Sequence, residues 1–233
     1  MKKVALVTGG NKGIGYGIAQ VLLNNGYSVA ITSRSLDSAQ HAAAKLGSTD
    51  DVLALEVDVR DFEAQKTAVE AIVKKWGRLD VLIANAGVGG FASIDEMEPE
   101  MWHNIIDTNL TGVFYSIKSA LAQIKENKGA IITISSLAGT NFFAGGSAYN
   151  ASKFGLTGFT QSVMLDLREQ GIRVSTIMPG SVASHFNDHE PDAEKDSWKI
   201  QPEDMGQIVV DLLAMPPRTL PSKIEVRPTK TKA

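Results

Sequence analysis

The stretch VALVTGGNKGIG, residues 4–15, decides the fold of this chain. Its first four residues are all apolar, which is typical of a short buried strand. The strand ends at Thr8, and the glycines that follow permit a tight turn with close approach of backbone segments. From Ile14 onward the apolar residues have helical spacing. A strand, a glycine turn and a helix in direct succession predict the start of a strand–helix–strand unit.

Strand-like and helix-like segments alternate along the rest of the chain. Strands are predicted at residues 4–7, 29–32, 52–57, 79–84, 130–134, 174–178 and 223–226. Helices are predicted at residues 14–25, 36–46, 62–76, 98–125, 147–170 and 203–215. This order predicts an α/β fold built from right-handed strand–helix–strand units, with a parallel sheet covered by helices on both faces. No linker or repeat interrupts it, so we expect residues 1–233 to form a single domain.

Composition excludes several classes of function. The 233 residues include no cysteine, which rules out disulfides, thiolate metal sites and cysteine nucleophiles. The four histidines have no metal-ligand spacing, so we expect no metal site. A net charge of −3 and 6% aromatic residues provide neither a basic surface nor a stacking surface for nucleic acid. The apolar run near the start is too short for a signal peptide, so we expect a cytoplasmic protein without membrane contact.

The glycine turn at residues 8–15 is a candidate phosphate-binding site. The free N–H groups at the start of the following helix favour an anion. The spacing is GxxxGxG, one residue different from the usual GxGxxG, and a glycine turn before a helix is common by itself. Because this turn follows the first strand of a strand–helix–strand unit, we predict that it binds the pyrophosphate of a dinucleotide.

Tyr149 and Lys153 lie four residues apart on a predicted helix and therefore share one face of it. A phenol titrates near pH ~10, and a neighbouring ammonium group favours its ionised form. Tyr149 is therefore a candidate general acid and base for a carbonyl/alcohol pair. Such a pair also arises by chance, so it carries little specificity alone.

Ser136 and Asn109 are further candidates, each with an open alternative. Ser136 follows the strand at 130–134, at the carboxyl edge where open α/β sheets bind ligands. Its hydroxyl can donate to a substrate oxygen, but Ser135 would serve as well, and either can simply form a turn. Asn109 lies inside the predicted helix 98–125, where asparagine has poor propensity. It either caps a local distortion or orients a water molecule.

Two stretches break the alternation. GTNFFAGG, residues 139–146, is a glycine-rich loop with two phenylalanines, and we expect it at the rim of a pocket. Residues 181–201 contain five acidic residues and two lysines, without a clear period. This second stretch is either a substrate lid or an ordinary surface loop.

Taken together, these residues resemble the classical short-chain dehydrogenase/reductase family. The resemblance is carried by residues 8–15, Asn85-Ala86-Gly87, Asn109, Ser136, Tyr149 with Lys153, and Pro179-Gly180, in the family's order. It implies a single-domain Rossmann fold with a seven-stranded, doubly wound parallel sheet. In the implied catalytic set, Ser136 and Tyr149 hold the substrate oxygen. Lys153 binds the nicotinamide ribose and lowers the pKa of Tyr149, and Asn109 holds a water molecule.

The resemblance also implies the residues of a cofactor site. Asp58 and Val59 border the adenine, residues 85–87 support the ribose side, and Ser184 stands where the family usually has threonine. The expected cofactor-binding residues are Gly9, Asn11, Lys12, Gly13, Ile14, Gly15, Ser33, Arg34, Asp58, Val59, Asn85, Ala86, Gly87, Tyr149, Lys153, Pro179, Gly180, Val182 and Ser184.

The end of the second predicted strand indicates which cofactor binds. NAD-specific sites place an acidic residue there, but this strand runs into Ser33 and Arg34. Asp37 is the nearest acid, and we expect it in the first turn of the next helix. Arg34 can bind a phosphate with two hydrogen bonds, and Lys12 approaches the same corner. We therefore predict NADP(H), the alternative being that both cations are solvated surface residues.

The predicted helix at 147–170 is apolar on two faces, since Phe154 and Leu165 lie opposite the face that carries Tyr149. One face packs on the sheet and the other predicts a second subunit, in a homodimer or homotetramer. The family resemblance points to the same helix and its predecessor.

The leading hypothesis is an NADP(H)-dependent oxidoreductase that moves a hydride between nicotinamide and a small or medium carbonyl or secondary alcohol. One alternative is a 3-oxoacyl-[acyl-carrier-protein] reductase. The acidic stretch at 181–201 disfavours docking of an acidic carrier, and residues 223–228 look more like the serine and 3-hydroxy-acid dehydrogenase subgroup. A second alternative is a non-catalytic dinucleotide sensor, which the intact Ser136, Tyr149 and Lys153 disfavour.

Overall fold

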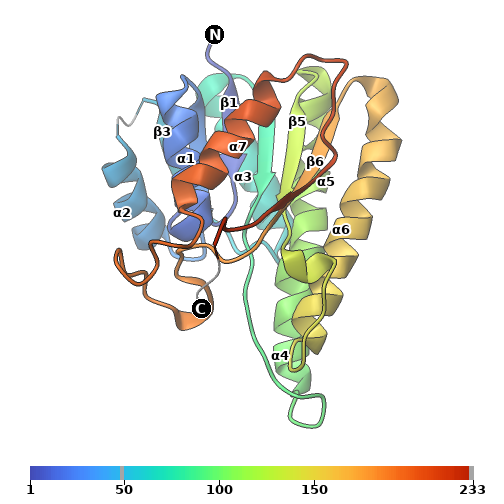
Figure 1. Cartoon of the computed structure of the whole chain (residues 1–233). Helices are drawn as coiled ribbons and strands as arrows, with labels where there is room; N and C mark the ends of the chain where they lie inside the picture. The colour runs from blue at the N-terminus through green and yellow to red at the C-terminus, as the bar shows by residue number, and fades with distance from the viewer. Residues whose placement is uncertain (48–49, 231–233) are drawn as a thin grey trace.

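The computed structural model describes residues 1–47 and 50–230 (Figure 1). Its strands are β1 (Val4–Val7), β2 (Ser28–Ser33), β3 (Val52–Glu56), β4 (Val81–Ala84), β5 (Ala130–Ile134), β6 (Arg173–Pro179) and β7 (Lys223–Val226). Its α-helices are α1 (Gly13–Asn24), α2 (Leu36–Leu46), α3 (Phe62–Trp76), α4 (Pro99–Ile106), α5 (Gly112–Glu126), α6 (Ser147–Leu167) and α7 (Pro202–Ala214).

The seven strands form one parallel sheet in the order β3-β2-β1-β4-β5-β6-β7. β1 pairs with β2 on one side, with Val4 opposite Ser28, and with β4 on the other, with Ala5 opposite Val81. The direction of winding therefore reverses between β1 and β4. In open α/β sheets, ligands bind at the carboxyl ends of the strands beside this switch point. The predicted doubly wound Rossmann sheet is confirmed.

Helices cover both faces of the sheet. Alternate residues of β1 enter different cores, Val7 with α1 and α7 on one face and Leu6 with α3 and α5 on the other. Figure 1 shows α1 and α7 side by side in front of the sheet. None of the helices in the described ranges is long and apolar enough to cross a bilayer.

The predicted helix at 98–125 is wrong in one respect. The structure divides it into α4, a π-helical turn at Asp107–Thr111, and α5. Asn109 lies in the π-helical turn, where its side chain bonds the backbone of a distant loop instead of facing solvent. The predicted helix at 147–170 also ends earlier, because its last three residues form a 3₁₀ turn before Gly171, which has φ 75°.

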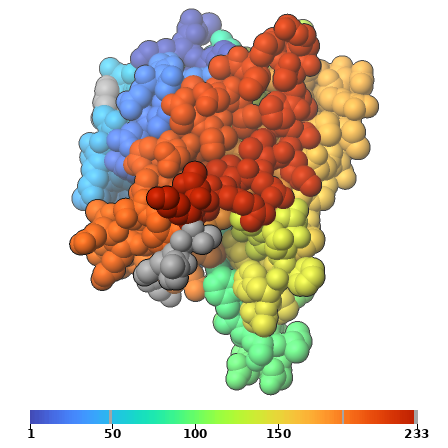
Figure 2. Space-filling model, viewed as in Figure 1, coloured from blue at the N-terminus to red at the C-terminus, as the bar shows by residue number. Residues whose placement is uncertain are grey.

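Three loops extend from the carboxyl edge of the sheet, after β4, β5 and β6. In Figure 1 the loop after β4 extends beyond the end of α4, and the loop after β5 lies beside that helix; the same projection extends below the main body in Figure 2. A single β-bridge joins them between Ala92 and Gly146, where the Ala92 N–H donates to the Gly145 carbonyl at 2.9 Å. The loop after β6 is closed at its base by a bridge between Val182 and Ile200. These loops build the walls of the site.

Candidate active site

A cavity of about 920 Å³ lies at the carboxyl edge of the sheet. It brings together most of the residues expected at the site from the sequence. Those that line it are Gly9, Asn11, Lys12, Gly13, Ile14, Ser33, Arg34, Asp58, Val59, Asn85, Ala86, Gly87, Ser136, Tyr149, Lys153, Pro179, Gly180, Val182 and Ser184. Gly15 and Asn109 are outside the cavity wall, and each supports it from behind.

The glycine turn after β1 has the shape of a cradle for an anion. A side chain at Gly15 would place its Cβ 2.4 Å from the Gly9 carbonyl oxygen, so only glycine fits there. The Asn85 amide donates to the carbonyls of Thr8 and Gly9, which ties the end of β4 to the turn. No described side chain caps the first turn of α1, so its N–H groups remain available toward the cavity. The turn therefore fits the pyrophosphate of a dinucleotide.

A basic corner lies beside this turn, at the end of β2. Arg34 and Lys12 both line the cavity there, and Asn11 approaches α2 by donating to the Ser38 hydroxyl at 2.8 Å. Asp37 lies in the first turn of α2, as expected, where its charge suits the helix dipole. The corner thus presents two cations and no acid from the end of the strand.

Asp58, expected beside an adenine, has a partner that the sequence reasoning missed. Arg60 binds its carboxylate with both Nε and Nη2, the latter at 2.6 Å. These hydrogen bonds hold the pKa of Asp58 below its ordinary value. The spacing of two residues was the available signal, because it lets an arginine fold back onto an aspartate in the same loop.

Tyr149 and Lys153 lie at the inner end of the cavity on one face of α6, with exposed fractions of 8% and 5%. The Lys153 Nζ donates to the Ile134 carbonyl at 3.1 Å and lies 5.8 Å from the centre of the Tyr149 ring. Burial lowers the pKa of Lys153 to about 8. A hydrogen bond joins the Ser136 and Tyr149 side chains. The side chains of Ser136, Tyr149 and Lys153, which can all take part in proton transfer, therefore lie close together in the cavity.

The pKa of Tyr149 differs from expectation. Burial raises it above the ordinary value of a phenol, and the hydrogen bond with Ser136 opposes this only in part. The expected lowering by Lys153 is not seen, and the Lys153 Nζ donates to the Ile134 carbonyl instead of to the phenol. Tyr149 is therefore a protonated phenol at neutral pH, which is the form that donates a proton.

The open alternatives for Asn109 and Ser135 are resolved in part. The Asn109 side chain accepts from the Val88 N–H at 2.8 Å and donates to the Val88 carbonyl at 2.9 Å and the Ser152 hydroxyl at 3.1 Å. It stabilises the helix distortion and fixes the loop after β4. The Ser135 hydroxyl contacts the Lys153 carbonyl and the Thr157 hydroxyl, so it is turned into α6. Ser136 is the serine that reaches Tyr149.

Aromatic side chains from three loops line the cavity beside Tyr149, and two of these loops, 139–146 and 181–201, were expected there as a pocket rim and as a possible lid. Phe143 belongs to the predicted rim at 139–146 and lines the cavity. Phe91 and Phe186 also line it and contact the Tyr149 ring. Phe91 lies outside helices and strands, and Phe186 begins a three-residue 3₁₀ turn, so neither segment is long enough to show a period in the sequence.

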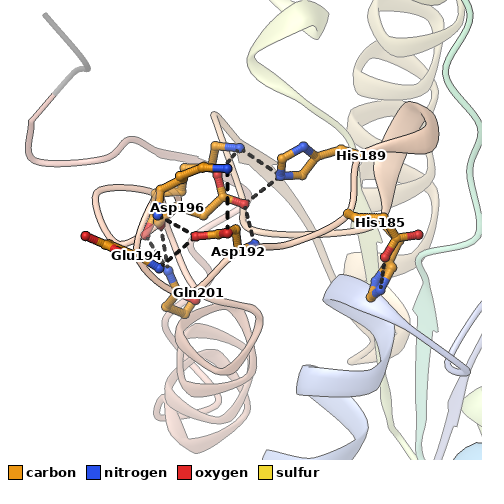
Figure 3. Close-up of polar contacts among 9 residues, drawn as sticks. His185, His189, Asp192, Glu194, Asp196 and Gln201 are labelled. Carbon is orange, nitrogen blue, oxygen red and sulfur yellow. Dashed lines mark hydrogen bonds and ion pairs between the residues drawn. The ribbon is translucent and has the colours of Figure 1, made fainter.

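The stretch at 181–201 is held together around Asp196, which is buried (Figure 3). Its carboxylate contacts the His189 Nε2 at 2.5 Å and the Lys199 Nζ at 2.7 Å, and it accepts from the Asp192 N–H at 3.2 Å. Lys199 and His189 hold the pKa of Asp196 far below its ordinary value. Within the described ranges, no three histidine or acidic side chains are arranged to hold a metal ion.

A sequence model of the short-chain dehydrogenase family matches residues 3–195. The chain belongs to this family. It is 37% identical over 188 residues to trans-4-hydroxycyclohexanecarboxylate dehydrogenase of Sinomonas cyclohexanicum, covering 78% of the chain and 73% of that protein. It is 35% identical over 204 residues to a 3-oxoacyl-[acyl-carrier-protein] reductase of Staphylococcus aureus, covering 86% and 83%.

Two solved structures of this family share the fold over nearly their full length. An alcohol dehydrogenase from the archaeon Thermococcus sibiricus, complexed with 5-hydroxy-NADP, has a TM-score of 0.92 at 26% identity and covers 100% of this chain and 99% of its own. A 3-ketoacyl-(acyl-carrier-protein) reductase from Brucella melitensis, complexed with NADH, has a TM-score of 0.87 at 26% identity, with 97% of each chain covered. This short-chain dehydrogenase is thus an oxidoreductase that uses a nicotinamide dinucleotide.

Proposed function

We propose that this short-chain dehydrogenase interconverts a small or medium ketone or aldehyde with its alcohol, using NADP(H). The observation that carries the proposal is the meeting of Tyr149, Ser136 and Lys153 at the inner end of the cavity. The glycine turn lies in the wall of the same cavity, so a dinucleotide held by the turn can reach the tyrosine. The bound nicotinamide supplies the hydride in reduction and accepts it in oxidation.

The chain's own residues provide the proton chemistry. In reduction, the hydroxyl groups of Ser136 and Tyr149 hold the substrate oxygen, and Tyr149 donates its proton to that oxygen. Lys153 would bind the nicotinamide ribose, with its ammonium group 5.8 Å from the centre of the Tyr149 ring. Asn109 contributes by position, because its bonds to Val88 and Ser152 connect the loop after β4 to α6. The burial of Tyr149 keeps bulk water away from the reacting oxygen.

The preference for NADP(H) rests on the basic corner at the end of β2. Arg34 and Lys12 line the cavity where the fold places the 2′-oxygen of the adenosine ribose, and the strand ends without an acid. Arginine binds a phosphate with two parallel hydrogen bonds, which a free ribose hydroxyl cannot replace. One solved relative is complexed with 5-hydroxy-NADP and the other with NADH, so the preference for NADP(H) is inferred from the basic corner alone.

A 3-oxoacyl-[acyl-carrier-protein] substrate is the second candidate, favoured by the relative from Staphylococcus aureus. The acidic stretch at 181–201 opposes docking of an acidic carrier protein. Kinetics with a carrier-bound 3-oxoacyl chain and with its small thioester analogue distinguish the two candidates. A strong preference for the carrier-bound chain would replace our proposal.

We also propose that the protein is a homodimer or homotetramer that associates through α5 and α6. Phe114, Phe154 and Leu165 are exposed on these helices, although apolar residues of this size are normally buried. Ala151 and Gly158 lie on the same exposed face of α6, and small residues let two helices approach closely. The stretch at 181–201 is the proposed substrate lid.

The direct test of the proposed reaction is absorbance of the reduced nicotinamide during incubation with a panel of carbonyl compounds. We expect turnover with NADPH by the purified protein. Binding of NADPH without oxidation across the whole panel would instead favour a dinucleotide sensor.

A further inference from the structure

Three phenylalanines from three different loops form a cluster on one side of Tyr149, and two of them contact its ring. The Phe91 ring, after β4, lies 5.7 Å from the Tyr149 ring in an edge-to-face arrangement with an interplanar angle of 84°. The Phe186 ring, after β6, lies 5.5 Å from it on a tilted plane. The Phe143 ring, after β5, packs edge-on against Phe91 at 5.5 Å. We call Phe91, Phe143 and Phe186 the aromatic box.

The backbone fixes the positions of these rings. A Cβ at Gly89 would lie 2.7 Å from the Phe186 ring, so Phe186 is seated directly on the loop after β4. A Cβ at Gly146 would lie 2.6 Å from the Phe143 ring. The bridge between Ala92 and Gly146 then joins the loops that carry Phe91 and Phe143. Three rings that each rest on glycine backbone or on a bridged loop form a defined wall.

The rings nevertheless leave much of their surface unburied. Phe91, Phe143 and Phe186 have exposed fractions of 43%, 47% and 37%, and all three line the cavity. Apolar surface left open inside a cavity gains free energy when an apolar ligand covers it. The wall beside Tyr149 is therefore suited to a hydrocarbon body attached to the reacting carbonyl.

The charged groups bordering this part of the cavity are already engaged. Lys199 is paired with Asp196 at 2.7 Å, and Arg227 is paired with Glu225 at 3.0 Å. Lys153 donates to a backbone carbonyl and belongs to the catalytic set. His185, which also lines the cavity, lies 3.6 Å from the Glu190 carboxylate. Among the described residues, the cations on this side of the cavity therefore already have partners, so desolvating a substrate carboxylate against the aromatic box is costly.

We propose that the aromatic box selects uncharged ring ketones and ring secondary alcohols as substrates, in preference to acyclic or carboxylated ones. This proposal rests on the proposed carbonyl/alcohol reaction and specifies the class of substrate for it. A compact ring covers the faces of the box while presenting its carbonyl to Tyr149. An acyclic chain of equal carbon number must lose more conformational freedom to do the same.

The first test compares three ketones with the unmodified enzyme and NADPH: cyclohexanone, 2-hexanone and 4-oxocyclohexanecarboxylate. Each has a six-carbon ketone skeleton. 2-Hexanone differs from cyclohexanone by lacking the ring, and 4-oxocyclohexanecarboxylate differs by carrying a carboxylate. We expect kcat/KM for cyclohexanone to exceed that of each of the other two by about tenfold or more. Equal or faster turnover of 2-hexanone or of the carboxylate would overturn the proposal.

The second test removes the rings one at a time. Phe91→Ala and Phe186→Ala are expected to lower the ratio of kcat/KM for cyclohexanone over 2-hexanone by about tenfold, mainly through KM. The matched control is Phe142→Ala, since this neighbouring ring is 85% exposed and lies outside the cavity wall. The control should leave the ratio unchanged, and all three variants should keep the unfolding midpoint and the Kd for NADPH within error.

The outcomes distinguish the ring selectivity from the proposed reaction. If the ratio of kcat/KM for cyclohexanone over 2-hexanone is unchanged in both Phe91→Ala and Phe186→Ala, or changes equally in Phe142→Ala, the proposed role of the aromatic box is wrong. Ketone turnover without a preference for rings would also refute the role of the aromatic box, but it would leave the proposed reaction intact. If the protein binds NADPH but turns over no carbonyl compound, both the proposed reaction and the ring selectivity are wrong.

Discussion

Replacing Arg34 by glutamine should shift the cofactor preference toward NADH. A hydrogen bond to a charged partner contributes about 1.5–3 kcal/mol, and 1.4 kcal/mol corresponds to about a tenfold change in binding. Arg34 is exposed to solvent, so the lower end of that range applies. We therefore expect the NADPH/NADH ratio of kcat/KM to fall about tenfold in Arg34→Gln.

Adding an acid at the end of β2 should extend the shift. Ser33→Asp places a carboxylate where it repels a 2′-phosphate and can accept hydrogen bonds from both ribose hydroxyls. The double variant Ser33→Asp/Arg34→Gln is expected to lower the ratio by about 10²–10³-fold, because two effects of similar size combine.

The assay is the initial rate of reduced nicotinamide oxidation with each cofactor under the same conditions. Arg168→Gln is the matched control, since this arginine lies in the 3₁₀ turn after α6, away from the cavity, and pairs only weakly with Glu169 at 3.6 Å. The reasoning is refuted if the unmodified enzyme already works as well with NADH as with NADPH. It is also refuted if Arg34→Gln changes the ratio no more than Arg168→Gln does.

Four further results are expected. Tyr149→Phe should lower kcat by about 10²–10⁴-fold with NADPH affinity kept, and retention of more than about a tenth of kcat would exclude Tyr149 as the proton donor. Because burial lowers the pKa of Lys153 to about 8, kcat/KM for reduction should fall as the pH rises through 8, and a flat profile from pH 7 to 9 would contradict this role. Asn109→Ala should lower the free energy of unfolding by about 2–4 kcal/mol, measured by urea denaturation, since it leaves both backbone groups of Val88 unpaired. Sedimentation at micromolar concentration should show no folded species of 25 kDa, and Leu165→Lys should produce one.

The fold could be predicted from the sequence because the signals for its helices and strands are local. The bounds of α2 and α3 agree with the expected ones, since each helix starts at a side-chain cap. Ser35 accepts from the Ser38 N–H, and Asp61 accepts from the Ala64 N–H. Gly77, with φ 76°, ends α3 in the left-handed region. Caps and apolar periods lie within a few residues of one another, so a single sequence contains them.

The features that could not be read depend on contacts between distant segments. The π-helical turn around Asn109 is stabilised by Val88, 21 residues away. Phe91 and Phe186 meet at Tyr149 from loops almost a hundred residues apart, and neither loop has a period. The glycine turn and the Tyr149–Lys153 pair were predictable in kind, because their chemistry depends on residue type and short spacing. The shape of the substrate wall depends on how three loops fold over one another.

Within three residues, the loop after β6 contacts both the glycine turn and the surroundings of Tyr149. Ser184 packs against the glycine turn, since a Cβ at Gly13 would lie 3.2 Å from the Ser184 Cβ. Phe186 packs on Gly89 and contacts the Tyr149 ring. A dinucleotide that contacts Ser184 would therefore also act on the position of the Phe186 ring, two residues further on, in the proposed substrate wall. Such coupling is reciprocal by thermodynamic necessity. The factor by which a bound cofactor tightens substrate binding must equal the factor by which a bound substrate retains the cofactor.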